Sequence, residues 1–343
     1  MNCLKFKKSI EIGGVMQIDF HFCMIYVLSR AVGFNTETSE KIAWASQFVD
    51  DCREDIEIRD ENGKLIKNHI VTSYNLINPK NFVFEEGFNV WIPFHFLPAG
   101  KGDSLPERLI CRNAMENPYV EKIIENYRSH SFDPIYLGII LHTIVDTFSH
   151  QGFSGMLSYR NKIDDVEPPL KSEKKRPKSK FADIINRICI FVEYVGSEIF
   201  SVGHAEANIR PDLPYLSWSY VNSQGKIKKI NNIEITEKAL FYVYDLLIEE
   251  AKKQNIEIKS NRTEIVSKII EKVKEFRIEN KLKRYNKWIN AIKNGDFDIE
   301  EEVEYKADNV QNDWLLKFHR NATDHKKFVQ KEILKDIFAE GYI

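Results

Sequence analysis

Apolar residues recur at helical spacing over residues 19–31 and again over residues 42–48. The segment Asn35-Thr36-Glu37-Thr38 lies between them and supplies a loop and a helix N-cap, because short polar side chains bond the free N–H groups of a first turn. This pattern predicts two helices at the start of the fold.

Two other segments have the alternation and turn residues of paired strands. The first, residues 56–74, alternates around Asn62-Gly63, a dipeptide typical of a type I′ hairpin. The second turns at Gln224-Gly225. We expect a small hairpin at each place. Prolines and glycines interrupt residues 79–106, so this segment is predicted to be an irregular connection.

Helices are also expected at 107–127 and 134–150. The second of these is apolar on nearly all sides, which is typical of a central, buried helix. Charge and proline fill residues 164–180, which we predict to be a mobile surface loop. Further helices are predicted at 181–202, 236–254, 262–279, 281–293 and 309–338.

These elements predict a mainly α protein with one or two small β-hairpins. We divide the chain into three parts: an N-terminal extension (1–15), a metal-binding helical domain (16–235) and a C-terminal helical region (236–343). The patterned sequence begins just after Met16. The C-terminal region is expected to be packed on the helical domain or appended to it.

Composition narrows the classes of partner. The chain has 343 residues, and its 49 basic and 51 acidic residues nearly cancel, so net charge does not indicate nucleic acid or an anionic membrane as a partner. Nucleic acid remains possible through local contacts.

Five cysteines are scattered without a CxxC spacing, which argues against a disulfide framework and a cysteine zinc site. No apolar run reaches about 20 residues. No export signal is visible either, and we expect a cytoplasmic protein.

The segment HTIVDTFSH, in the predicted central helix, carries the candidate chemistry. His142, Asp146 and His150 are four residues apart in turn, so on a helix they share one face. Buried ionisable groups are costly without partners. His142 and His150 would lie about 12 Å apart along the axis, too far for one ion. Asp146 has two oxygens and could bridge two cations. This spacing favours a site with several metal ions.

Other histidines and acids are candidates for the remaining ligands. Imidazole and carboxylate together suit zinc, manganese or iron rather than calcium. The candidates are His21 beside Asp19, Asp50 and Asp51 at the end of the second helix, His69 in the hairpin, His95 in IPFHFLP, and His204 with Glu206 and Asn208 beyond it.

Alternative interpretations remain open for several of these residues. His142, Asp146 and His150 could instead form a buried hydrogen-bonded network, and His95 could be a core histidine bonded to the backbone. His69 could face solvent. Spacing does not decide between Asp50 and Asp51. We expect His130, His319 and His325 to be structural or exposed.

The segments DFH, SQFVDD, IPFHFLP, HTIVDTFSHQGFSG and VGHAEANIRPDLPYL together resemble an uncharacterised bacterial family of helical proteins. More distantly, the order His, Asp, His, His-x3-Asp, His, His is similar to the zinc-dependent phospholipase C and P1 nuclease superfamily. Members of that superfamily are all-helical and bind three zinc ions, with the Asp of an HxxxD helix bridging two of them. The resemblance covers about residues 17 to 220.

This resemblance implies a phospholipase C/P1 nuclease-like helical bundle and a ligand for each motif position. The superfamily also uses the mature N-terminal amine as a ligand, and His150 follows Asp146 by four residues rather than six. The implied ligands are His21, Asp50 or Asp51, His69 or His95, His142, Asp146, His150, His204 with or without Glu206, and Asp19 in place of the amine.

The first functional hypothesis is a metal-dependent hydrolase of phosphate esters with two or three divalent ions, most simply zinc, that activate water. Asp50, Asp51 or Asp19 would orient or deprotonate that water, and Asp146 would be essential to activity. Arg160 or Arg210 would contact phosphate. The alternative is a non-catalytic helical protein with a structural metal site and a C-terminal interaction surface. A diiron oxygen-activating protein needs paired ExxH motifs, which are not clearly present.

Overall fold

The structure is a computed structural model. It describes residues 18–53, 58–59, 65–66, 70–74, 78–170, 202–307 and 312–339. Three predictions lie largely or wholly outside these residues: the extension at 1–15, the helix at 181–202 and the part of the charged loop after residue 170.

The two predicted opening helices are confirmed. The first begins as a π-helix, η1 (Asp19–Met24), and continues as α1 (Ile25–Ala31). The second is α2 (Thr36–Asp51), whose first turn is capped by the Asn35 side chain accepting from the Thr38 N–H at 2.8 Å. The π-turns of η1 widen the helix by one residue per turn, a feature often found at functional sites.

The predicted first hairpin is present as two short antiparallel strands, β1 (Ile58–Arg59) and β2 (Leu65–Ile66). Ile58 pairs with Ile66. The turn at Asn62-Gly63 lies outside the described residues.

The prediction of an irregular connection over 79–106 is wrong in its first half. Residues 79–94 form η2 (Pro79–Phe82), α3 (Phe84–Glu86), η3 (Gly87–Trp91) and α4 (Ile92–Phe94). Pro93 lies within this continuous helical stretch, one residue before its end at Phe94. Gly87 packs directly on Met156, so its lack of a side chain serves close contact rather than a turn.

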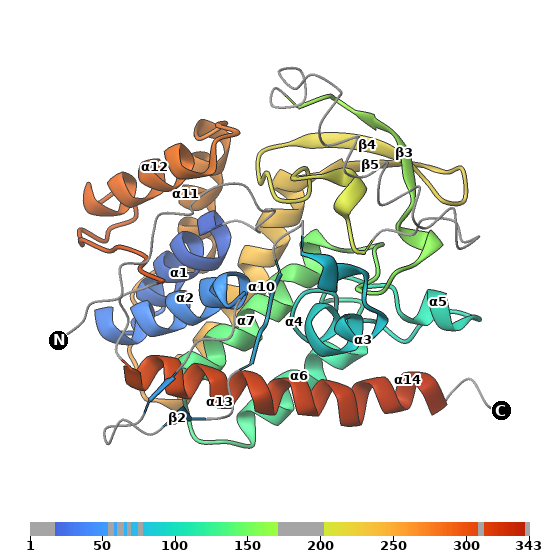
Figure 1. Ribbon diagram of the computed structural model, residues 1–343. Coiled ribbons are helices and arrows are strands. Elements are labelled where there is room, and N and C mark those ends of the chain that lie inside the picture. The colour runs from blue at the N-terminus through green and yellow to red at the C-terminus, as the bar shows by residue number, and fades with distance from the viewer. Residues whose placement is uncertain are drawn as a thin grey trace.

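The helix predicted at 107–127 is interrupted. It is divided into α5 (Leu105–Arg108) and α6 (Pro118–Arg128), and isolated β-bridges at Ile110 and Cys111 separate them. The central helix is confirmed as α7 (Pro134–Ser149), capped by Asp133 and buried along nearly its whole length. Figure 1 shows α7 crossing the middle of the molecule between α2 and α10.

A three-stranded antiparallel sheet lies at one end of the helical body (Figure 1). Its strands are β3 (Ile163–Glu167), β4 (Ser217–Asn222) and β5 (Ile227–Asn231), with short helices η4 (Tyr159–Asn161) and η5 (Ala205–Ala207) nearby in sequence. The β4–β5 hairpin confirms the second predicted turn, where Gly225 has φ of +71°. Strand β3 contradicts the loop predicted from residue 164, because its backbone pairs with β4 while its acidic side chains face solvent.

The predicted C-terminal helices are present as α10 (Asn232–Lys253), α11 (Arg262–Glu275) and α12 (Lys281–Lys293), followed by α13 (Asn312–Phe328), η6 (Val329–Leu334) and α14 (Lys335–Ala339). Leu240, Trp288 and Ile333 belong to the same hydrophobic core as Met24 and Ile140. The C-terminal region thus packs on the rest of the helical body. The described chain is mainly helical with a small sheet, as predicted.

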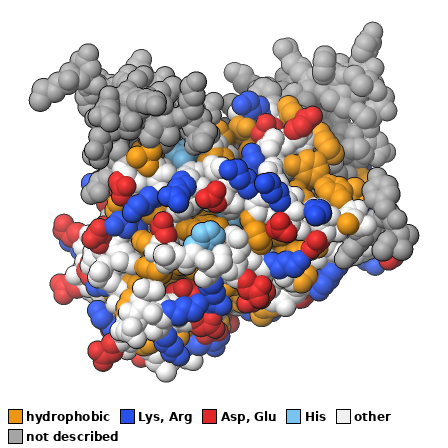
Figure 2. Space-filling model, turned by 90° about the horizontal axis from the view of Figure 1, so that it is seen from below, with side chains coloured by type: hydrophobic (Ala, Val, Ile, Leu, Met, Phe, Trp, Pro, Cys, Tyr) orange, Lys and Arg blue, Asp and Glu red, His pale blue; other side chains and the backbone are white. Residues whose placement is uncertain are grey.

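On the face along α13 and α14, acidic and basic side chains are interspersed (Figure 2). This face has no field of a single sign that would attract a polyanion. In the part of the chain that the structure describes, no helix combines the length and apolar character that crossing a bilayer requires.

Helices α2 and α7 approach each other closely at Gly138. A Cβ on Gly138 would collide with the Ile42 carbonyl oxygen and lie 2.8 Å from the Cβ of Ala45.

We expect Gly138→Ala to lower the free energy of unfolding by about 1–3 kcal/mol through overpacking, although helix propensity alone would favour alanine by about 1 kcal/mol. Urea denaturation measures the change. Lys238→Ala, on the exposed face of α10, is the control and should change stability by less than about 0.5 kcal/mol. A Gly138→Ala protein of unchanged stability would contradict this account of the contact.

Candidate metal centre

Asp146 of α7 lies at the centre of a buried cluster of imidazoles. Its Oδ1 is 3.1 Å from His21 Nε2, and its Oδ2 is 3.0 Å from His95 Nδ1 and 3.2 Å from His142 Nε2. The four side chains come from η1, from the residue after α4, and from α7, and each is at most 2% exposed. Three segments distant in sequence therefore meet at one carboxylate.

The cluster is one part of a larger arrangement of histidines and aspartates. In three groups, the ligand-type atoms lie close enough together to hold a metal ion. The groups are His21, His142 and Asp146; Asp50, His95 and His142; and His150, His204 and Asp212. The first two groups share His142, and the third group shares no residue with either of them.

Backbone carbonyls orient the imidazoles of the first two groups. His142 Nδ1 is 2.7 Å from the Ser46 carbonyl oxygen, and His95 Nε2 is 2.8 Å from that of Thr72. A carbonyl only accepts hydrogen bonds, so each of these ring nitrogens carries the hydrogen. In the neutral rings the lone pairs are then on His142 Nε2 and His95 Nδ1, which face each other at 3.2 Å.

The third group repeats this pattern. His150 Nδ1 donates to the His95 carbonyl oxygen at 2.7 Å, and His204 Nδ1 donates to that of Asn208 at 3.1 Å. The two Nε2 atoms face each other at 3.1 Å. Facing lone pairs repel unless a proton or a cation lies between them. Metal-binding histidines typically donate their other N–H to a carbonyl or carboxylate, as these do.

The separations also fit coordination. Two nitrogens bound to one tetrahedral zinc at about 2.0–2.1 Å lie about 3.3 Å apart. Asp146 lies 3.0–3.2 Å from His21, His95 and His142, and His95 lies 3.2 Å from His142. His150 lies 3.1 Å from His204, whereas Asp50 and Asp212 are farther, at 3.9 Å from His95 and His204 respectively. These distances suit shared coordination without large side-chain movement.

Each group also has a buried carboxylate oxygen that accepts no hydrogen bond from any residue that the structure describes. These atoms are Asp146 Oδ1, Asp50 Oδ2 and Asp212 Oδ1, one in each group. Buried polar atoms are rarely left unsatisfied, because removing them from water without a partner costs free energy. Asp146 Oδ1 is close to His21 Nε2 but without hydrogen-bond geometry. The residues therefore fit divalent metal, and a donor set of imidazole and carboxylate suits zinc, manganese or iron.

Burial controls the protonation of the cluster. It raises the pKa of Asp50, Asp146 and Asp212, each to about 7. It also lowers the pKa of His204 to about 4 and that of His21 well below its ordinary value. The histidines are thus neutral near pH 7, and bound cations would supply the positive charge that stabilises the ionised carboxylates.

Local structure explains how each side chain reaches the site. Ser46 and Asp50 lie one turn apart on α2, so the Ser46 carbonyl and the Asp50 carboxylate face α7 together. His95 ends α4, where the chain leaves the helix. Gly203, with φ of +56°, lies against the Phe96 ring, and a Cβ there would overlap that ring. Glycine at this position lets His204 approach His150.

Asp50 and Asp51, which spacing could not separate, have different surroundings. Asp50 Oδ1 lies 3.9 Å from His95 Nδ1, inside the cluster. Asp51 points away from it and accepts from Gln47 Nε2 at 2.9 Å and from the Tyr305 hydroxyl at 2.8 Å. Asp51 therefore belongs to a supporting network and to none of the three groups.

Other candidate residues also lie apart from the three groups. Asp19 forms a buried ion pair with Arg284 of α12 and belongs to none of the three groups. The Glu206 carboxylate accepts from the Ile163 N–H, and the Asn208 carbonyl oxygen accepts from His204. His69 lies outside the described residues.

The expected helical stripe from His142 to His150 is only partly present. The helix ends at Ser149, and His150 is its C-cap, so its ring faces His204 rather than His142. Asp212, in RPDLPYL, was missed as a candidate. An aspartate between two prolines, eight residues after His204, was the available signal, because such a segment is a rigid turn.

The histidines and arginines outside the cluster have structural contacts. His325 is bonded to the Pro93 carbonyl, His319 accepts from the Ile70 N–H, and His130 is bonded to the Asn126 carbonyl on the surface. Arg160 pairs with Glu107, and Arg210 donates to the Pro168 carbonyl. The two arginines proposed to contact phosphate are thus held by the protein.

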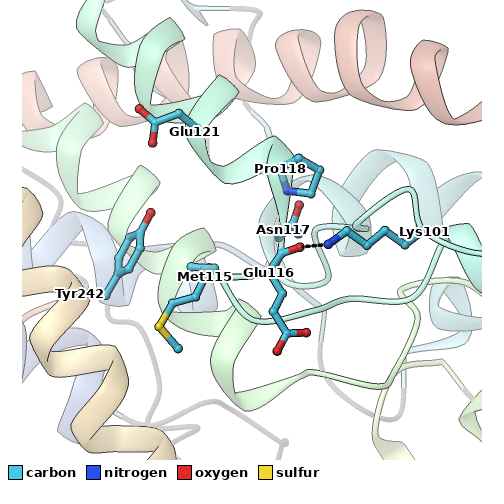
Figure 3. Close-up of a pocket in the computed structure, with 8 residues that line it drawn as sticks. Lys101, Met115, Glu116, Asn117, Pro118, Glu121 and Tyr242 are labelled. Carbon is cyan, nitrogen blue, oxygen red and sulfur yellow. Dashed lines mark hydrogen bonds between the residues drawn. The ribbon is translucent and has the colours of Figure 1, made fainter.

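A surface pocket of about 340 Å³ lies elsewhere, near the start of α6 (Figure 3). Lys101 donates to the Glu116 carbonyl oxygen at its edge at 2.7 Å, and Met115, Glu121 and Tyr242 also line it. It shares no residue with the three groups, so the candidate chemistry lies in the buried centre and not in this pocket.

Residues 16–337 match the family of unknown function DUF6765. The chain therefore belongs to this family, which agrees with the resemblance to an uncharacterised family. No curated protein and no solved structure matches the chain.

We expect protein purified without chelators to contain two or three equivalents of divalent metal. Asp212→Asn should lose about one equivalent, because it weakens the third group only. Asp51→Asn is the control and should retain the full complement, whereas Asp50→Asn should not. Elemental analysis per chain measures these values. A wild-type protein without metal, or equal losses in Asp50→Asn and Asp51→Asn, would contradict the assignment.

Metal binding should weaken as the pH falls. The three carboxyls have a pKa of about 7 in the metal-free protein, so below pH 7 protons compete with the cation. The pKa of His204 is about 4, so this imidazole remains neutral at pH 6 and does not add to the competition. The rise in melting temperature on adding stoichiometric zinc should be larger at pH 8 than at pH 6. For each ligand carboxyl that must lose a proton, the apparent affinity for zinc should fall about tenfold per pH unit below pH 7. A larger rise at pH 6 would be incompatible with these carboxyls as ligands.

Proposed function

We propose that the protein is a metal-dependent hydrolase of phosphate esters, similar in its centre to the zinc-dependent phospholipase C and P1 nuclease superfamily. The observation that carries the proposal is the contact of one carboxylate, that of Asp146, with histidines of two adjacent groups. An aspartate that bridges two ions, with a third group close by, is the arrangement that the resemblance implies. Both the phospholipase C-like fold and the hydrolysis of phosphate esters are part of this proposal.

In this proposal, the three groups, Asp146 and Asp50 have distinct roles. Divalent cations held by the three groups would lower the pKa of water and offset negative charge at phosphorus. Asp146 would hold two of them at a fixed spacing. The buried Oδ2 of Asp50 has no hydrogen bond within the described part of the chain, so it is suited either to bind a cation or to accept a proton from water.

Exposure indicates the side from which a substrate would enter. The His204 side chain is 15% exposed, whereas the side chains of His142 and Asp146 are completely buried. Asp212, beside His204, is 6% exposed. The third group thus lies nearest to solvent, and a phosphate ester would reach the cluster through it.

Complete burial of the first two groups favours a second candidate function. Structural metal sites are closed by protein ligands, whereas catalytic sites keep a position open for water. If all ligand positions were filled by the chain, the ions would only stabilise the helical body.

An assay with a chromogenic phosphodiester separates these two functions. Protein loaded with zinc or manganese should hydrolyse bis(p-nitrophenyl) phosphate, and a chelator should stop the reaction. Asp146→Asn should lower kcat at least about a hundredfold by disturbing two groups at once, with the circular dichroism spectrum nearly unchanged.

Asp51→Asn is the matched control, because Asp51 is adjacent in sequence but bonded to Gln47 and Tyr305. It should retain kcat within about threefold. Bound metal without turnover of any phosphate ester would favour the structural function, as would unfolding of Asp146→Asn.

A further inference from the structure

His95 follows a short helical segment whose own hydrogen bonding is incomplete. This segment consists of η3 and α4 and leads the chain into the metal cluster. The Ile92 N–H donates to the Gly87 carbonyl oxygen, as in a π-turn. The next donor would be Pro93, which has no N–H, so the Phe88 carbonyl cannot be satisfied in this way. The Pro93 carbonyl lies in the last turn of α4, where helix carbonyls lack partners within the helix.

Helix α13 and the adjoining η6 supply a donor to each of these carbonyls. Gln330 Nε2 donates to the Phe88 carbonyl oxygen at 3.0 Å, and His325 Nε2 donates to the Pro93 carbonyl oxygen at 2.8 Å. Donors and acceptors are both five residues apart in sequence. The C-terminal helical region therefore holds the segment before His95 at two points.

His325 also contacts α7. Its Nε2 lies 3.3 Å from Thr143 Oγ1, and Thr143 directly follows His142. The His325 ring is completely buried and lies beside the Phe94 ring, with centroids 5.6 Å apart. His325 thus lies between the end of α4 and the middle of α7. These two elements present His95 Nδ1 and His142 Nε2 to each other at 3.2 Å.

The contribution of His325 is one donated hydrogen bond. Burial lowers the pKa of His325 to about 4, so the ring is neutral near pH 7. Its single ring hydrogen is on Nε2, because the Pro93 carbonyl only accepts. His325 belongs to none of the three groups that could hold a metal ion. Without this donor the Pro93 carbonyl would lose its partner beside a buried ring, which is unfavourable.

We propose that His325 is a positioning residue of the metal cluster. With Gln330 it holds the segment that carries His95, and so fixes the distance between His95 and His142. This inference rests on the proposed function and gives the C-terminal helical region a part in the metal centre. Removing a group that orients a metal ligand typically costs about 10–100-fold in metal affinity or activity. We expect the lower value, because His325 acts through the backbone two residues before His95.

Competition with a chromogenic zinc chelator measures the metal affinity of each variant. His325→Phe keeps a ring of similar size but removes the N–H, and it should weaken the binding of one zinc equivalent about tenfold. His325→Gln offers an amide N–H near the position of Nε2, so its affinity should stay within about threefold of wild type. Equal zinc affinity in His325→Phe and wild type would overturn the proposal.

Asn321→Leu is the matched control for the loss of a buried hydrogen bond from α13. Asn321 is 9% exposed, and its Nδ2 donates to Asp133 Oδ2 at 3.0 Å, at the start of α7 and away from the cluster. Asn321→Leu should be less stable than wild type but bind zinc with the same affinity. A loss of zinc affinity equal to that of His325→Phe would show that His325 acts on stability alone and refute the proposal.

The visible spectrum of the cobalt-loaded protein reports coordination geometry, which a loss of stability alone does not change at saturation. In His325→Phe the cobalt bands should shift or change intensity, because His95 and His142 no longer keep their distance. The bands should be unchanged in His325→Gln and in Asn321→Leu. Identical spectra for His325→Phe and wild type would contradict a positioning role.

Gln330→Met tests the other contact if His325→Phe fails to fold. Methionine keeps the side-chain length of Gln330 and removes the amide donor. This variant should bind zinc about threefold more weakly, a smaller effect because Phe88 is farther from His95 in the chain. Deuterium exchange should be faster in a peptide covering residues 88–97. Unchanged affinity and exchange would refute the role of these contacts.

Deuterium exchange without metal separates this inference from the proposed function. In metal-free protein, residues 88–97 should exchange faster in His325→Phe than in wild type, whereas α11 should exchange equally in both. If this difference is present but wild type hydrolyses no phosphate ester, the hydrolase is refuted and the role of His325 in holding the segment is kept. Hydrolysis by wild type, with unchanged affinity, spectrum and exchange in His325→Phe, would refute only the positioning role.

Discussion

Burial of the Asp146 carboxylate in the middle of an apolar helix is the constraint on which the rest of the structure depends. A carboxylate in this position is stable only with a proton or with positive charge beside it. The surrounding groups are imidazoles whose pKa is lowered by burial, so they provide lone pairs rather than charge. Divalent cations would satisfy the carboxylate and the lone pairs together. This shared requirement explains why polar groups from four segments converge in the hydrophobic interior.

The backbone around the cluster fixes its geometry. Carbonyl oxygens of Ser46, Thr72, His95 and Asn208 each receive a ring N–H and thereby orient an imidazole. Close packing of α2 on α7 at Gly138 sets the distance between the Ser46 carbonyl and His142. The C-terminal helices add a further layer, since Arg284 neutralises Asp19 and Tyr305 bonds Asp51. Two acids near the cluster thus have partners from the C-terminal helical region.

Local patterns predicted most of the helices, because helical periodicity and capping residues act within one or two turns. The Asn35 cap and the buried α7 are examples. Predictions failed where packing overrode local preference. Residues 84–94 are helical despite Gly87 and Pro93, and Gly87 allows close contact with Met156. Strand β3 forms in a charged segment because β4 offers its edge for pairing, while the charges face solvent.

The sequence by itself determined that His142 and Asp146 share one face of a buried helix, because four residues make about one turn. It also indicated His21, His95 and His204 as candidates, through their unusual local settings. Tertiary structure alone decided that Asp50 and not Asp51 faces these histidines, that His150 pairs with His204, and that Asp212 completes the third group. Such choices depend on contacts between segments far apart in the chain, which no local periodicity records.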